Sequence, residues 1–150
     1  EQGHLFNWIL VEADGARHLP LKAPAPHEPV VPLSSRWVVA VVGLDAIGRP
    51  LTDKWVFRSR LFAEITGLAP GAAITEESVA VALVHEKGIM KSCPADALRY
   101  VFLNKAETEE RRLMGRRIAH ILREKARMRP ERVIIGALKQ ETEPWECYVL

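Results

Sequence analysis

Residues 37–42 read Trp-Val-Val-Ala-Val-Val, an apolar run without a polar residue at any alternate position. A strand with one face in water alternates apolar and polar side chains, so an unbroken run indicates a strand covered on both faces. Three further short apolar runs lie at residues 8–11, 100–103 and 133–135. These four runs predict an α/β fold whose mainly parallel sheet has helices on both faces.

Helical patterns occupy the stretches between and after these runs. Residues 55–66 and 108–127 carry apolar stripes at helical spacing, and Thr75 is a favourable N-cap for a further helix. Gly67 and Pro130 follow the first and the longest of these segments, where each favours the end of a helix. Strands that alternate with helices imply right-handed crossovers, and we expect a single α/β domain over residues 1–150.

Composition excludes several classes of protein. Hydrophobic residues make up 48% of the chain and charged residues 27%, the balance of a globular protein. The net charge of +2 is too small to indicate nucleic-acid binding, and no apolar run approaches the roughly 20 residues that cross a bilayer. Cys93 and Cys147 stand far apart without a C-x-x-C motif, as in a reducing compartment, so we expect a cytoplasmic protein.

The start of the chain is abrupt for a parallel sheet. Its first residue is Glu1 rather than Met, and a buried-looking strand is predicted only a few residues later. We therefore expect the domain to be incomplete at the N-terminus. The sequence leaves the oligomeric state open.

Acidic residues follow the first predicted strand, at the edge where parallel sheets bind ligands. Glu12 and Asp14 are candidate catalytic carboxylates, and Asp14 is a candidate Mg²⁺ ligand, directly or through water. Gly15 would let the backbone approach a phosphate or adopt an unusual φ. The alternative is an acidic turn that binds nothing.

Asn104, Lys105 and Glu107 follow the third predicted strand in an N-K-x-E pattern. The related N-K-x-D motif of GTPases binds a base, because its carboxylate accepts hydrogen bonds from guanine and its lysine stem packs on the ring. Glutamate is one methylene longer, so GTP and ATP both remain candidates. The alternative is that Asn104 and Lys105 form a turn and Glu107 opens the next helix.

Residues 20–32 contain five prolines and predict a stiff, extended loop. This proline loop carries Lys22, His27 and Glu28, which we expect to face a ligand or a partner. His27 is a candidate general base because its ordinary pKa lies near neutrality, although a solvated histidine is the alternative. Asp45, after the second predicted strand, either shapes the same rim or belongs to an ordinary turn.

Two phosphate-binding motifs are absent from the sequence. There is no G-x-x-x-x-G-K-[ST], which cradles the β- and γ-phosphates, and no G-x-G-x-x-G, the dinucleotide fingerprint. An NTPase function therefore requires residues upstream of this chain.

Several blocks of the sequence resemble the YqeC family of selenium-dependent hydroxylase accessory proteins. They are residues 11–17 (Val-Glu-Ala-Asp-Gly-Ala-Arg), 19–24 (Leu-Pro-Leu-Lys-Ala-Pro), 27–32 (His-Glu-Pro-Val-Val-Pro), 42–51, 65–68, 74–75 and 103–107. The resemblance implies a P-loop-NTPase-like fold, of which this chain is the C-terminal portion, with Mg²⁺ and a nucleoside triphosphate as cofactors. It also implies a role in maturing selenium-containing molybdenum hydroxylases. Phe57 and Glu107 depart from the family's usual His and Asp.

Two functions from different classes follow. The first is a nucleotide-binding NTPase that serves a molybdenum hydroxylase client. The second is a non-hydrolysing module that docks a partner enzyme or a molybdopterin-like cofactor through the proline loop. A small-molecule transferase is less favoured, because neither cysteine has a partner histidine in the sequence.

Overall fold

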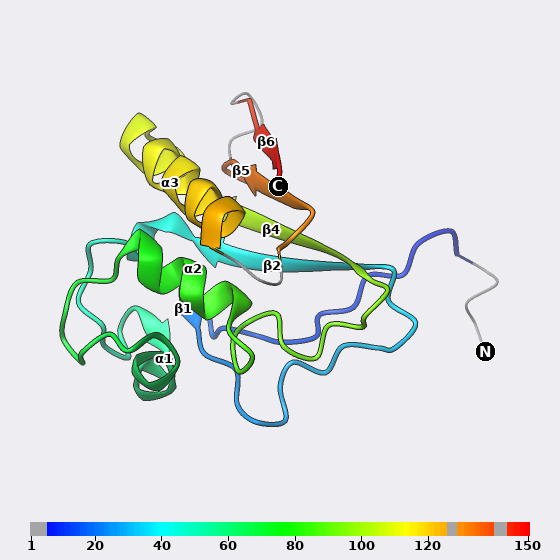
Figure 1. Ribbon diagram of the computed structural model, residues 1–150, viewed down its shortest axis with the longest axis horizontal. Helices are drawn as coiled ribbons and strands as arrows, with labels where there is room; N and C mark the ends of the chain where they lie inside the picture. Colours follow the sequence, from blue (N-terminus) through cyan, green and yellow to red (C-terminus); the bar gives the residue numbers. More distant parts are fainter. Residues whose placement is uncertain (1–5, 126–128, 140–143) are drawn as a thin grey trace.

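A computed structural model describes residues 6–125, 129–139 and 144–150 (Figure 1). Within these residues, three helices, six strands and a short 3₁₀ turn follow one another. They are β1 (Leu21–Lys22), β2 (Trp37–Gly43), the 3₁₀ turn (Leu44–Ala46), β3 (Val56–Phe57), α1 (Ser59–Thr66), α2 (Glu76–Val84), β4 (Leu98–Asn104), α3 (Glu109–Lys125), β5 (Arg132–Ile135) and β6 (Glu146–Val149).

The main sheet has the strand order β2-β4-β5-β6, and the first three of these strands are parallel. The sequence predicted these three strands, and the α/β class is confirmed. The antiparallel strand β6 was not predicted. Gly43 pairs with Asn104 across β2 and β4, so the carboxyl ends of both strands lie at one edge of the sheet.

The strand predicted at residues 8–11 is wrong, because this segment has no regular secondary structure. Its side chains are 57–93% exposed. An apolar strand needs a hydrogen-bonded neighbour, and within the described residues β2 forms a ladder only with β4. The segment instead contacts β2 through its first residue, since the rings of Trp8 and Trp37 lie 4.9 Å apart.

The helices form a connected layer rather than covering both faces of the sheet. Helix α3 packs against β5 and α2, and α1 packs against α2 (Figure 1). Ile118 and Leu122 of α3 are buried in the core beneath this layer. The alternate side chains of β2, Trp37, Val39 and Val41, are 43–57% exposed. At β2 the expectation of helices on both faces is therefore not met.

The structure confirms the helix end predicted at Gly67 and the helix N-cap predicted at Thr75. Thr75 caps α2 as predicted, because its Oγ1 accepts a hydrogen bond from Ser78 N at 3.1 Å and its N–H donates to Ser78 Oγ. Gly67 ends α1 in the left-handed region, with φ 72°. Helix α1 begins at Ser59 rather than at residue 55, because Val56–Phe57 pairs with β1 as β3. The end predicted for the longest helix, at residue 127, lies outside the described residues.

None of the helices in the described part of the chain combines the length and the apolar character that crossing a bilayer requires.

Candidate functional site

The carboxyl ends of β2 and β4 meet the start of the proline loop at Gly43. The N–H of Gly43 donates to the carbonyl of Pro20 at 2.8 Å. A Cβ added at Gly43 would lie 2.6 Å from Asp45 Oδ1 and 2.8 Å from Pro20 Cβ, closer than real Cβ contacts. The proline loop and the turn after β2 therefore approach this closely because residue 43 has no side chain.

On one side of Gly43 lies the proline-loop cluster, which we define as Asp14, Lys22, Glu28 and Arg58. Glu28 is its centre. Its carboxylate accepts from Arg58 Nη1 at 2.5 Å and Nη2 at 3.1 Å, and it lies 2.8 Å from Lys22 Nζ. The Arg58 guanidinium, followed by Lys22, holds the pKa of Glu28 far below its usual range despite partial burial. The proline loop is thereby fixed to the start of α1.

Lys22 ties the predicted acidic turn to this cluster. Its side chain is 9% exposed and forms an ion pair with Asp14, while Nζ also donates to the Gly15 carbonyl at 2.9 Å. The Lys22 ammonium group lies against the Asp14 carboxylate, in the position that a metal cation would have to occupy. The described residues contain no group of three or more His, Cys, Asp or Glu side chains arranged for a metal ion. This arrangement does not fit the Mg²⁺ predicted at Asp14, and we derive no step through that ion.

The other residues predicted around the proline loop lie at its margin. Glu12 is exposed, and a Cβ added at Gly15 would meet its Oε1 at an ordinary 3.5 Å. Gly15 is absent from the positive-φ residues, whereas the neighbouring Arg17 and His18 have φ values of 52° and 63°. The side chain of His27 is 78% exposed, with Nε2 3.9 Å from Glu28 Oε1. These placements leave the predicted catalytic roles of Glu12, Asp14 and His27 untested.

On the other side of Gly43 lies the strand-end cluster, which we define as Asp45, Asn104, Lys105, Glu107 and Arg111. Asn104 Oδ1 accepts from the N–H groups of Lys105 at 2.8 Å and Leu138 at 3.1 Å. These two hydrogen bonds to the backbone hold the loop after β5 against the end of β4. Lys105, with φ 64°, reaches Asp45 Oδ2 at 2.7 Å.

The glutamate of the N-K-x-E pattern already has a partner. Arg111 Nη1 donates to Glu107 Oε2 at 2.6 Å and to the Lys105 carbonyl at 3.1 Å. Before Glu107 could accept hydrogen bonds from a base, its ion pair with Arg111 would have to break. By contrast, Asp45 Oδ1 is buried and has no hydrogen-bond partner among the described residues. A buried acceptor of this kind favours a donor from a ligand or a water.

Sequence reasoning missed Arg58 and Arg111 as parts of these clusters. Arg58 adopts φ 61° and comes from a segment that was predicted to be helical. The available signal was the resemblance to the YqeC family, whose usual His-Arg pair stands at positions 57–58 and shares the arginine, but not the histidine, with this chain. The contact of Gly43 with Pro20 has no local signal in the sequence, because it joins distant parts of the chain.

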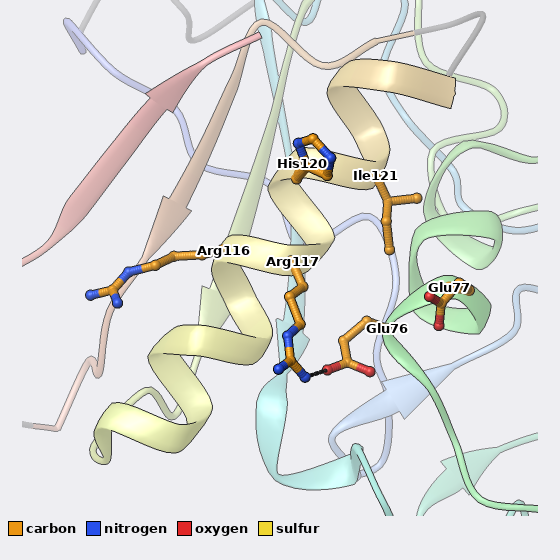
Figure 2. A pocket seen from close by; sticks show the side chains of 6 residues that line it. All are labelled: Glu76, Glu77, Arg116, Arg117, His120 and Ile121. Atoms are coloured by element: carbon orange, nitrogen blue, oxygen red, sulfur yellow. Dashed lines mark hydrogen bonds and ion pairs between the residues drawn. The ribbon is translucent and has the colours of Figure 1, made fainter.

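A groove on the described surface lies elsewhere. Figure 2 shows this groove of about 550 Å³, whose lining comes from α2 and α3. Arg117 crosses it to donate to Glu76 at 3.2 Å, and Arg116 points away toward Glu146. None of the predicted site residues lines this groove.

Comparison with known proteins gives two matches and one negative result. Residues 1–60 match the family described as YqeC protein. Over 97 residues, the chain is 41% identical to the "Uncharacterized protein YqeC" of Escherichia coli (strain K12), a match that covers 65% of this chain and 38% of that relative. No solved structure matches the chain.

Proposed function

The chain belongs to the YqeC family, and on that premise we propose that it binds a nucleotide at the carboxyl edge of its sheet. We further propose that this binding serves the maturation of selenium-dependent molybdenum hydroxylases, the role that the family resemblance implies.

The observation that carries the proposal is the pair formed by Lys105 and Asp45. These residues follow β4 and β2, the two neighbouring parallel strands, and their charged groups lie 2.7 Å apart. The Lys105 side chain is 41% exposed, so its aliphatic stem is available to pack against a flat base. The Asn104 side chain holds the loop after β5 in place by accepting a hydrogen bond from Leu138 N. This is the edge at which open parallel sheets bind their ligands.

The ion pair between Glu107 and Arg111 bears on base selectivity. A guanine would have to compete with Arg111 for the carboxylate, which costs part of the binding energy. We therefore propose that discrimination between guanine and adenine is weaker than an unpaired aspartate would give.

Isothermal titration with GTP and ATP tests this proposal. We expect Lys105→Ala to weaken nucleotide binding about tenfold, the loss of one charged contact. Lys87→Ala is the matched control, because Lys87 is an exposed lysine away from the sheet edge. Equal affinities of the wild type and Lys105→Ala, or no binding by the wild type, would contradict the proposal.

A second candidate function is supported by the surface of the proline loop. Val30, near the end of this loop, and Leu33, just after it, are 69% and 91% exposed, and the Glu28 network holds the loop in place. A rigid loop that presents apolar side chains favours the docking of a client protein or its cofactor. A double variant, Val30→Ser with Leu33→Ser, would separate the two functions: client binding should fall while nucleotide affinity stays unchanged.

A further inference from the structure

Three cationic side chains gather around the ring of Phe57 at the inner end of the proline loop, and a fourth lies against the same loop. The Cζ atoms of Arg17 and Arg58 lie 4.6 and 4.4 Å from the ring centroid, and Lys22 Nζ lies 5.4 Å from it. Lys91, from the loop between α2 and β4, donates to the carbonyl of Ala25 at 2.6 Å. The set comes from three distant parts of the chain, because Arg17 and Lys22 are only five residues apart.

The carboxylates in this region are too few to neutralise these cations. Asp14 and Glu28 are engaged by Lys22 and Arg58. Within the described residues, Arg17 and Lys91 form no ion pair with a carboxylate. Four cations against two carboxylates leave an excess of two positive charges beside the strand ends.

Of the two unpaired cations, Arg17 is exposed and Lys91 is half-buried. The Arg17 guanidinium lies over the Phe57 ring and forms no hydrogen bond within the described residues, so its donors are available to a ligand. Partial burial lowers the pKa of Lys91, with Arg58 adding to this effect and Glu28 opposing it. An anion placed between these groups would offset the cost of burying the charged form of Lys91. It would also reduce the repulsion between the cations.

We propose that Arg17, Arg58 and Lys91 form a binding site for the polyphosphate chain of a ligand. Guanidinium forks and an ammonium group are the donors that proteins use for phosphate oxygens. This inference rests on the proposed nucleotide function, and it names the part of the nucleotide that each region holds: the base lies at Lys105 and the phosphates lie at the Phe57 ring.

Titration with inorganic triphosphate tests this site without a base. We expect the wild type to bind triphosphate and the variants Arg17→Ala and Lys91→Ala to bind it about tenfold more weakly. Arg60→Ala is the matched control, because it removes the same charge from a 93% exposed arginine on α1. Its affinity for triphosphate should equal that of the wild type. Arg17 is exposed, so the Arg17→Ala result stays interpretable even where Lys91→Ala lowers the thermal midpoint.

The outcomes separate this inference from the proposed function. A parallel titration with guanosine and adenosine, which lack phosphates, reports on the strand-end cluster alone. Triphosphate binding that depends on Arg17 supports the phosphate site, even where nucleosides fail to bind and the base site is lost. No binding of triphosphate, or an equal loss in Arg17→Ala and Arg60→Ala, would overturn the inference.

Discussion

The two clusters on either side of Gly43 are built in opposite ways. The strand-end cluster takes its central residues from the ends of β2 and β4 and the turns that follow them, so strand pairing brings it together. The proline-loop cluster depends on ion pairs, one of which, Glu28 with Arg58, joins residues 30 positions apart. Regular secondary structure positions the first cluster, whereas charge pairing positions the second. Their stabilities should therefore respond differently to mutation and to pH.

We expect the largest effect on stability from removing the Glu28 carboxylate, the centre of the proline-loop cluster. Glu28→Ala leaves Lys22 and Arg58 partly buried without this carboxylate, and we expect it to lower the free energy of unfolding by about 3 kcal/mol. Chemical denaturation measures this change. Glu64→Ala is the control, since Glu64 forms only an exposed pair with Arg60 and its loss should change stability by less than about 0.5 kcal/mol. Equal effects of the two variants would mean that the cluster does not position the loop.

Gly43→Ala should damage the contact between the two clusters. The added methyl group would lie within 3 Å of both Asp45 and Pro20, so we expect a loss of about 2 kcal/mol in the free energy of unfolding. Gly15→Ala is the matched control, because its new Cβ meets only an ordinary contact at 3.5 Å. A stable Gly43→Ala protein with unchanged ligand affinity would show that the clusters act independently.

The pH dependence of stability should also distinguish the clusters. The pKa of Glu28 lies below its usual 4.5 in the folded state, so the unfolded state binds protons first as the pH falls. The stabilisation is complete well above pH 4.5 and declines below it, by about 1–2 kcal/mol between pH 6 and pH 3. Glu146 adds to this decline, because Arg116 lowers the pKa of Glu146 to about 2.

Comparing Glu28→Gln with the wild type isolates the contribution of Glu28 to that decline. Urea denaturation across this pH range should give a flatter profile for Glu28→Gln. Identical slopes for the two proteins would contradict the role of the Glu28 ion pairs.

Asn104→Ala should give the smallest of these effects. It removes one oxygen that accepts two backbone hydrogen bonds, and we expect a loss of about 1 kcal/mol in the free energy of unfolding. Asn104→Asp keeps the acceptor and should retain most of the stability. If both variants lost the same amount, the side-chain amide rather than its oxygen would be the stabilising group.

The sequence was sufficient where local chemistry decides the structure. Thr75 and Gly67 mark helix ends through their own hydrogen bonds and backbone angles. The strands β2, β4 and β5 follow from their apolar runs. The placement of Asn104 and Lys105 at the carboxyl edge then follows from strand polarity.

The sequence was insufficient where distant segments decide the structure. Residues 8–11 have the composition of a strand, but a strand also requires a neighbour to pair with. The partners of Glu28 and Glu107 are arginines that no motif identified, so neither ion pair was predicted. In α3, Arg112 is buried and Arg116 pairs with Glu146 of β6, a strand that the sequence did not reveal.

The most direct test of the proposed site is an NMR titration that follows the backbone amides as GTP is added. We expect the signals of Gly43, Lys105 and Lys22 to shift together with one dissociation constant, because the ligand spans both clusters across the carboxyl edge of the sheet. The signals of Glu76 and His120, which line the groove between α2 and α3, should stay unchanged. Shifts confined to that groove, or none at Gly43 and Lys105, would contradict a ligand site at this edge.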